Sequence, residues 1–204
     1  MKKIVALIFI IILSSISVVF ADEGRSAVVP NDQAIIDWTQ AIAQDPSDAI
    51  AYFKRGKAYQ SKNQYDAAIS DFTKAIEINP NYAVAYLTRG YIYDNIKKQP
   101  DLAFDDYNSA VICDPDYAYA YNNRGSIYLK KSQYNLAIQD FNIAIKLDHK
   151  YVKPYFNKGT AYEKQQQYEE AIDTYKELLI NISPQDTQSI ENVKNRIRAL
   201  GGTV

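Results

Sequence analysis

Apolar and aromatic residues recur at helical spacing along most of the chain, and short polar turns divide them into segments. The stretch AYNNRGSIYLKK, residues 120–131, places apolar side chains on three successive turns of one helix face. Gly125 lies in the middle of this stretch, where a glycine destabilises a helix by about 1 kcal/mol relative to alanine. The glycine therefore needs a structural reason.

The glycine recurs together with its surroundings. AYFKRGKAY (51–59), AYLTRGYIY (85–93), AYNNRGSIY (120–128) and PYFNKGTAY (154–162) are variants of one sequence, and their glycines lie 34, 35 and 34 residues apart. A second helical pattern follows each of them, with Ala68, Ala103, Ala137 or Ala171 and then Phe72, Tyr107, Phe141 or Tyr175. Repeats of this length predict stacked units of helix, turn, helix and turn.

The repeat assigns a role to the glycine. We expect the missing side chain to let the two helices of a unit approach closely, with the small alanines of the second helix at the contact. The second repeat is one residue longer than the others, and we place its extra residue in KKQPD, residues 97–101, as part of a loop.

The spacing Tyr-x-x-Arg-Gly-x-x-Tyr, followed by Ala-x-x-x-Phe and then Pro, resembles the tetratricopeptide repeat (TPR). Tyr stands here where the family has Trp, and Arg or Lys where it has Leu. The resemblance implies an all-α fold, a right-handed α-solenoid of helix-turn-helix repeats. Its four units are TPR 1 (49–82), TPR 2 (83–117), TPR 3 (118–151) and TPR 4 (152–185).

Two further segments flank the four repeats. Ala34, Trp38 and Ala41 repeat the second-helix pattern without a first helix, so residues 31–48 are expected to form an orphan half-repeat helix that covers TPR 1. Residues 186–204 are expected to form a capping helix and tail, apolar inward and polar outward, with Ser183 as its N-cap. The apolar stripe of this helix consists of Ile190, Val193, Ile197 and Leu200.

The N-terminus predicts export. Lys2 and Lys3 precede an apolar run from Ile4 to Phe20, and acidic residues follow Ala21, which is typical of a secretory signal peptide over residues 1–21. Residues 22–30 are then a linker, and the body is expected outside the cytoplasm, in a bacterial periplasm. Cleavage would leave no stable membrane insertion. The alternative is a retained N-terminal membrane anchor, since about 17 apolar residues suffice to span a bilayer.

Composition narrows the functional classes. The 24 acidic and 23 basic residues nearly balance, so no nucleic-acid partner is expected. Cys113 is the single cysteine and excludes an internal disulfide; its equivalents Ile78 and Leu147 are apolar, so we predict that it is buried. His149 is the single histidine. The sequence holds no triad, metal-ligand cluster or phosphate-binding loop, and we expect neither catalysis nor a cofactor.

Tyrosine is abundant, with 18 residues, and most of these recur at fixed positions of the repeat, as scaffold residues would. Tyr91 and Tyr119 do not recur. The family resemblance implies that first helices line a concave groove and that these two rings face into it, and rings with amides suit an extended peptide. The alternative is that both are tolerated surface residues. The expected groove residues are Phe53, Lys57, Leu87, Tyr91, Tyr119, Asn122, Asn123, Ser126, Lys153, Phe156, Asn157 and Thr160.

Some family members hold a C-terminal carboxylate with Lys and Asn at set groove positions. Asn123 and Lys153 match two of these positions, whereas Leu87 and Tyr91 occupy positions that require Lys and Asn. The set is incomplete, so a specific carboxylate pocket is not expected.

A basic residue precedes each repeat glycine: Arg55, Arg89, Arg124 and Lys158. This series could bind anions. However, the second helices carry an aspartate at one fixed position, and only in the last repeat, which no further repeat follows, is it replaced, by Thr174. We therefore predict ion pairs between successive repeats, each modest in energy if exposed. The predicted pairs are Asp37 with Arg55, Asp71 with Arg89, Asp106 with Arg124 and Asp140 with Lys158.

The function expected from these features is non-catalytic binding of a protein or an extended peptide segment. Two other functions stay open. The orphan helix lacks its usual partner, so the chain could self-associate as a homodimer through Ile35 and Trp38. Tyr91, Tyr119 and the neighbouring amides could instead bind cell-wall glycan.

Overall fold

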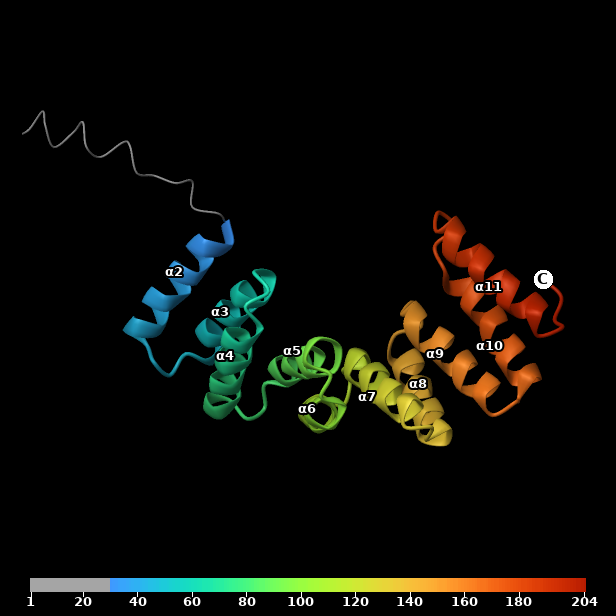
Figure 1. The fold of residues 1–204 in the computed structure, drawn as a ribbon, viewed down its shortest axis with the longest axis horizontal. Helices are drawn as coiled ribbons and strands as arrows, with labels where there is room; N and C mark the ends of the chain where they lie inside the picture. The colour runs from blue at the N-terminus through green and yellow to red at the C-terminus, as the bar shows by residue number, and fades with distance from the viewer. Residues whose placement is uncertain (1–29) are drawn as a thin grey trace, which may run out of the picture.

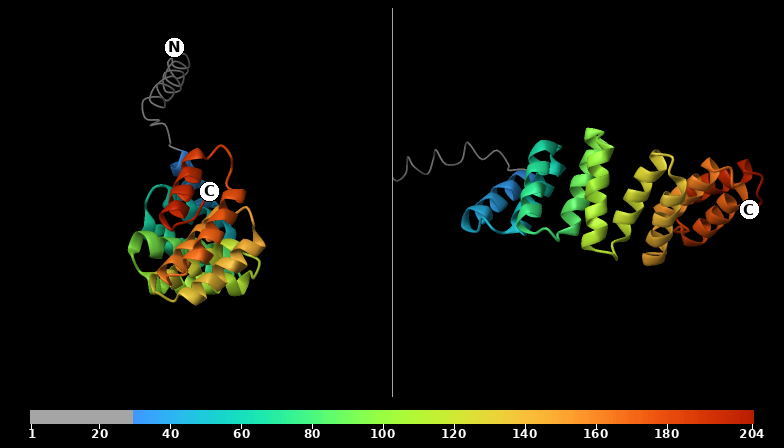
Figure 2. Two further views of the ribbon diagram at one scale, coloured as in Figure 1. Left: turned by 90° about the vertical axis from the view of Figure 1, so that its right-hand side faces the viewer. Right: turned by 90° about the horizontal axis from the view of Figure 1, so that it is seen from below.

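The computed structural model describes residues 30–204, and the predicted signal peptide and all of the linker except Pro30 lie outside them. The described part holds ten α-helices and no strand. A first helix, α2, is followed by four helix pairs and a last helix, α11, and neighbouring pairs stack along a curved path (Figures 1 and 2). The all-α solenoid expected from the sequence is confirmed.

The helix boundaries follow the repeat. The single helices are α2 (Pro30–Gln44) and α11 (Thr187–Ala199). The pairs are α3 (Ala49–Ser61) with α4 (Tyr65–Ile78), α5 (Ala83–Ile92) with α6 (Pro100–Cys113), α7 (Ala118–Lys130) with α8 (Tyr134–Leu147), and α9 (Val152–Lys164) with α10 (Tyr168–Asn181). Here the first helices are α3, α5, α7 and α9, and the second helices are α4, α6, α8 and α10.

Each repeat glycine contacts an aromatic ring of the second helix in its own pair. A Cβ atom added to Gly56 would lie 2.7 Å from Cε1 of Phe72, and one added to Gly125 would lie 2.8 Å from Cε1 of Phe141. Gly90 faces Tyr107 at 2.9 Å in the same way, and Gly159 faces Tyr175. The close approach is confirmed, but the ring that follows the alanine by one turn makes it, rather than the alanine itself.

The arginine before the glycine pairs within its own repeat. Arg55 binds both carboxylate oxygens of Asp71 at 2.7 and 2.8 Å, and Arg124 binds those of Asp140 at 2.8 and 2.9 Å. Arg89 and Asp106 form the same pair at 2.6 and 3.0 Å. The predicted pairing with the preceding repeat is therefore wrong. The aspartate precedes the ring that packs on the glycine, so the contact that seats the ring also places the carboxylate beside the arginine.

The same guanidinium groups also reach the preceding second helix. Nη1 of Arg89 donates to Thr73 at 2.8 Å, and Nη1 of Arg124 donates to Asn108 at 2.9 Å. Each of these two arginines thus links its repeat to the preceding one by a hydrogen bond to an uncharged side chain. Asp37, which was expected to pair with Arg55, accepts instead from Gln33 on its own helix.

A different set of pairs joins successive repeats, at the turn between the two helices of a repeat. Lys97 pairs with Asp66 at 2.5 Å, and Lys131 pairs with Asp101 at 2.7 Å. Lys62 pairs with Asp32 in the same way. In the last repeat an amide pair replaces the ion pair, since Gln165 donates to Asn135 at 2.6 Å. The carboxylates of Asp66 and Asp101 are largely exposed, so each pair adds little stability but fixes the register of stacking.

The extra residue of the second repeat lies in a helix rather than in a loop. Each turn inside a repeat contains one residue with φ near +60°: Asn63, Lys98, Ser132 and Gln166. This residue follows its glycine by seven positions in three repeats and by eight for Lys98. The added residue is absorbed by a π-helical turn, η1 (Tyr93–Lys97), at the end of α5. The predicted insertion at 97–101 is therefore wrong.

Cys113 is only partly buried, contrary to the prediction from its apolar equivalents. It is the last residue of α6, as Ile78 is of α4 and Leu147 is of α8, and Leu147 is also exposed. The position lies at the C-terminal end of the second helix, where burial is incomplete in TPR 2 and TPR 3. The thiol lies 3.4 Å from the carbonyl oxygen of Pro80, and burial raises the pKa of the thiol.

The two ends of the solenoid are covered differently. At the C-terminus, α11 buries Val193 and Ile197, and Arg196 pairs with Glu163 of α9 at 2.5 Å. Asp186 is the N-cap of α11 rather than Ser183, because its carboxylate accepts the backbone N–H of Ser189 at 3.1 Å. At the other end, α2 packs on α3 and leaves Ile36 exposed. Across residues 30–204, no helix is long and apolar enough to cross a bilayer.

Candidate functional site

All four first helices border one cavity, of about 480 Å³, which we call the groove cavity. The side chains come from α3, from α5, from α7 and from the start of α9. They are Lys57, Gln60, Leu87, Thr88, Tyr91, Tyr119, Asn123, Tyr151 and Lys153. In the views of the fold these helices follow the curve of the solenoid from one end to the other (Figure 1). A groove along the first helices is the surface that the family resemblance implies.

A second cavity, of about 390 Å³, lies at the C-terminal end between α9, α10 and α11, and we call it the cap cavity. Lys153 borders both cavities, so the two lie on either side of this residue. The lining residues are Val152, Lys153, Phe156, Asn157, Leu178, Ile182, Ser189, Asn192 and Val193.

The structure brings eight of the twelve predicted groove residues to these two cavities. Lys57, Leu87, Tyr91, Tyr119, Asn123 and Lys153 line the groove cavity, and Phe156 and Asn157 line the cap cavity together with Lys153. Phe53 and Asn122 are buried, with 8% and 4% of their surface exposed. Ser126 and Thr160 line neither cavity and are partly buried.

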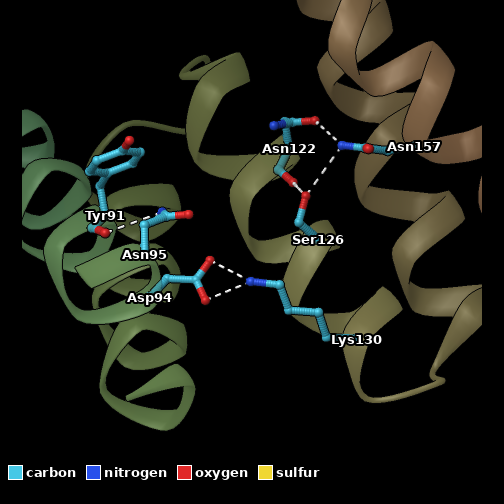
Figure 3. Close-up of polar contacts among 7 residues, drawn as sticks. All are labelled: Tyr91, Asp94, Asn95, Asn122, Ser126, Lys130 and Asn157. Atoms are coloured by element: carbon cyan, nitrogen blue, oxygen red, sulfur yellow. Dashed lines mark hydrogen bonds and ion pairs between the residues drawn. The ribbon is translucent and has the colours of Figure 1, made fainter. Parts of the chain in front are cut away.

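Asn122 and Ser126 have a structural contact instead. The side-chain amide of Asn157 donates to Oδ1 of Asn122 at 3.0 Å and lies 3.3 Å from Oγ of Ser126 (Figure 3). Oγ of Ser126 in turn donates to the backbone carbonyl of Asn122 at 2.8 Å. These bonds join α7 directly to α9 across the inner side of the stack. Asn157 also lines the cap cavity, so these bonds fix one of its lining residues.

Exposed aromatic rings line the groove cavity. Tyr91 and Tyr119 have 48% and 50% of their surface exposed. The ring of Tyr119 lies 4.6 Å from that of Tyr151, centroid to centroid, and 6.1 Å from that of Tyr117. Tyr151 is one of the recurring tyrosines that the sequence analysis took for scaffold, because Tyr82 and Tyr117 occupy the same position in the two earlier inter-repeat turns. Its role in the cavity depends on Tyr119, which does not recur and which places a second ring beside it.

The lining of the groove cavity carries positive charge. Lys57 and Lys153 contribute ammonium groups, and neither lining set contains an aspartate or glutamate. The acid nearest in sequence to Tyr91, Asp94, is engaged by Lys130 of α7 at 2.6 and 2.7 Å (Figure 3). The π-helical turn also carries Asn95, whose amide donates to the backbone carbonyl of Tyr91 at 3.2 Å. The groove is therefore locally basic although the whole chain carries a net charge of −1.

The four residues that the sequence analysis compared with the carboxylate positions of the family all line one cavity. They are Asn123 and Lys153, which match such positions by sequence, and Leu87 and Tyr91, which do not. Within the described residues, no three histidine, cysteine or acidic side chains gather in a group that could hold a metal ion.

Family models for the tetratricopeptide repeat match residues 49–82, 72–103, 107–139 and 152–184, and a further TPR repeat model matches residues 31–63 and 125–166. Together they cover nearly all of the solenoid.

The chain belongs to the tetratricopeptide repeat family.

Solved TPR structures share the fold. MamA is 24% identical, and the match covers 74% of this chain and 82% of MamA with a TM-score of 0.67. YrrB, a TPR protein with an unusual peptide-binding site, is 21% identical, with 81% and 84% coverage and a TM-score of 0.67. The first TPR of Spaghetti, bound to an HSP90 peptide, is 27% identical, with 59% and 94% coverage and a TM-score of 0.52. No curated protein sequence matches this chain.

The Tyr119–Tyr151 pair beside the groove cavity should make the free energy of unfolding depend on pH, because the phenol of Tyr151 is partly buried. Burial raises the pKa of Tyr151 to about 12, and Tyr119 and Asp148 add to the effect. An unfolded tyrosine titrates near pH 10, so between pH 10 and pH 12 the unfolded chain loses the proton first and the free energy of unfolding falls. We expect Tyr151→Phe to reduce this loss by about 2 kcal/mol at most, measured by urea unfolding at pH 9 and pH 11.5. Equal pH dependence in the two proteins would contradict the partial burial of the phenol.

Proposed function

We propose that the protein binds an extended segment of a partner protein in the groove cavity and acts as a non-catalytic scaffold. One observation carries the proposal: side chains from all four first helices border a single cavity. The family supports it, since the TPR structures of YrrB and Spaghetti are described with peptide-binding sites or bound peptide.

The lining fits the chemistry of an extended peptide. Such a peptide presents unpaired backbone N–H and C=O groups along its length, and the amides of Gln60 and Asn123 can both donate and accept hydrogen bonds. The exposed rings of Tyr91 and Tyr119 provide rigid contact area at a small cost in side-chain entropy. The two lysines favour a segment that carries acidic residues.

A displayed library of random linear peptides tests this function. We expect selection on the wild-type protein to enrich peptides that lose at least about tenfold in affinity for the double variant Tyr91→Ser, Tyr119→Ser, since interface tyrosines commonly contribute more than 1 kcal/mol each. Affinity is measured by fluorescence anisotropy with labelled synthetic copies of the enriched peptides.

The matched control is Tyr168→Ser. Tyr168 is 48% exposed, the same fraction as Tyr91, but it begins α10 and lines neither cavity. Affinity should be unchanged in this variant. A library that yields no binder, or binders that are equally affected by both substitutions, would overturn the assignment of the groove.

We also infer that the protein acts outside the cytoplasm. Support comes from Lys2, Lys3 and the apolar run Ile4–Phe20, which fit a signal peptide ending at Ala21. When the full chain is produced in a bacterium, mass spectrometry of the periplasmic fraction should find a mature protein that begins at Asp22. Recovery of the intact chain from the cytoplasm would contradict export, and recovery of the intact chain from membranes would indicate a retained anchor.

A further inference from the structure

Tyrosine is the N-cap residue of three first helices, α5, α7 and α9, as Tyr82, Tyr117 and Tyr151. None of the three makes a side-chain capping hydrogen bond, so the tyrosines are not there to cap. The rings of Tyr82 and Tyr117 instead pack at one position in the first helix of the preceding repeat. Tyr82 packs on Phe53 with ring centroids 5.1 Å apart, and Tyr117 packs in the same apolar cluster as Leu87.

The covered position recurs as Phe53, Leu87, Asn122 and Phe156. In the first and third repeats it is buried, and in the second it is partly buried. In the fourth repeat the next N-cap is Asp186 instead of tyrosine, because α11 is a cap rather than a repeat. Phe156 then has 44% of its surface exposed. The last repeat therefore has Phe156 at this position but no N-cap tyrosine in the following helix to pack on it.

The cap cavity lies where this ring is missing. Phe156 lines it together with Val152, Leu178, Ile182 and Val193, so its walls are mainly apolar. The polar groups at its border are Lys153, Asn157, Ser189 and Asn192. Lys153 also borders the groove cavity, and it has no ion-pair partner among residues 30–204. A carboxylate beside an aromatic group in the cap cavity would meet this ammonium group.

We propose that the cap cavity binds a large aromatic side chain of the partner segment, in the place that Tyr82 and Tyr117 occupy over the earlier repeats, with an adjacent acidic residue at Lys153. This proposal rests on the proposed function and makes it more specific. The groove cavity holds the extended backbone, and the cap helix α11 completes an anchoring pocket at one end of it. Helix α11 is then part of the binding site and not only a cover for the last repeat.

The blocked tripeptide acetyl-Asp-Tyr-Asp-amide tests the pocket directly. In NMR titrations of the nitrogen-labelled protein, we expect saturable shifts at the backbone amides of Ser189, Asn192 and Val193. Acetyl-Asp-Ala-Asp-amide should bind about tenfold more weakly, because it lacks the ring contact with Phe156. Acetyl-Asn-Tyr-Asn-amide should also bind more weakly, because it lacks the charge that meets Lys153.

Asp186→Tyr supplies the ring from within the chain and should weaken binding of acetyl-Asp-Tyr-Asp-amide about tenfold by competing for the cavity. Loss of the negative charge at Asp186 would by itself favour an acidic peptide, so weaker binding cannot come from charge. Tyrosine stands at the N-caps of α5, α7 and α9. Asp186→Ala removes the same capping carboxylate of α11 without adding a ring and should bind at least as well as the wild type does, so a loss confined to Asp186→Tyr comes from the ring. Ser183→Tyr, in the same turn but outside the cavity lining, should leave binding unchanged.

The proposal is overturned if the tyrosine and alanine tripeptides shift the same amides equally, if neither shifts them, or if Asp186→Tyr binds as well as the wild type. Peptides from the displayed library decide the proposed function separately. Library peptides that depend on Tyr91 and Tyr119 but show no aromatic preference and no sensitivity to Asp186→Tyr would preserve the groove and reject the anchoring pocket.

Discussion

The contact between a glycine and an aromatic ring is the interaction on which the solenoid depends. At Gly56, Gly90, Gly125 and Gly159 a Cβ atom would lie within 2.9 Å of a ring carbon of the second helix, closer than van der Waals contact allows. Each ring is 0 or 1% exposed, so it cannot move into solvent to make room. The helix-propensity cost of four glycines, about 1 kcal/mol each, is offset by the burial of four large side chains. The contact fixes the distance and rotation between the two helices of a repeat.

Other features follow from this contact. The residue before each ring is an aspartate in three repeats, and the residue before each glycine is an arginine in the same three, so seating the ring brings the two charges together as a bidentate pair. The arginine then uses its remaining nitrogen to reach the preceding repeat. In the fourth repeat Lys158 and Thr174 replace the pair. The packing of the ring on the glycine thus orients the two helices of a repeat and, through the arginine, also the contact with the preceding repeat.

The sequence predicts the fold well because the repeat contains four copies of each position. The prediction fails for features that depend on which side chains are neighbours in space. The helices and their order follow from periodicity, but the partner of Arg55 depends on which helix lies nearer. Asp37 precedes Arg55 by 18 residues and Asp71 follows it by 16, so the two separations are too similar to choose between them. The π-helical turn of residues 93–97 cannot be told from a loop insertion by length alone. At the groove, Tyr91 and Tyr119 are found from sequence because they do not recur. Phe53 and Asn122, which occupy the same position of two repeats, were expected in the groove but are buried. Both contact the next repeat, through Tyr82 and Asn157. Tyr151 is missed because a recurring residue can serve the scaffold and the cavity at once.

A double-mutant cycle of Gly125 and Phe141 tests the central contact most directly, with the free energy of unfolding measured in urea. Gly125→Ala alone should lower the stability by about 1 kcal/mol or more, because overlap with the ring exceeds the gain in helix propensity. In the Phe141→Leu background Cε1 is absent, and the contact of the added Cβ atom with Asp140 Cβ at 3.1 Å remains. The same change should therefore destabilise the protein by at least about 1 kcal/mol less than in the wild type. A change of equal sign and size in both backgrounds would contradict the account.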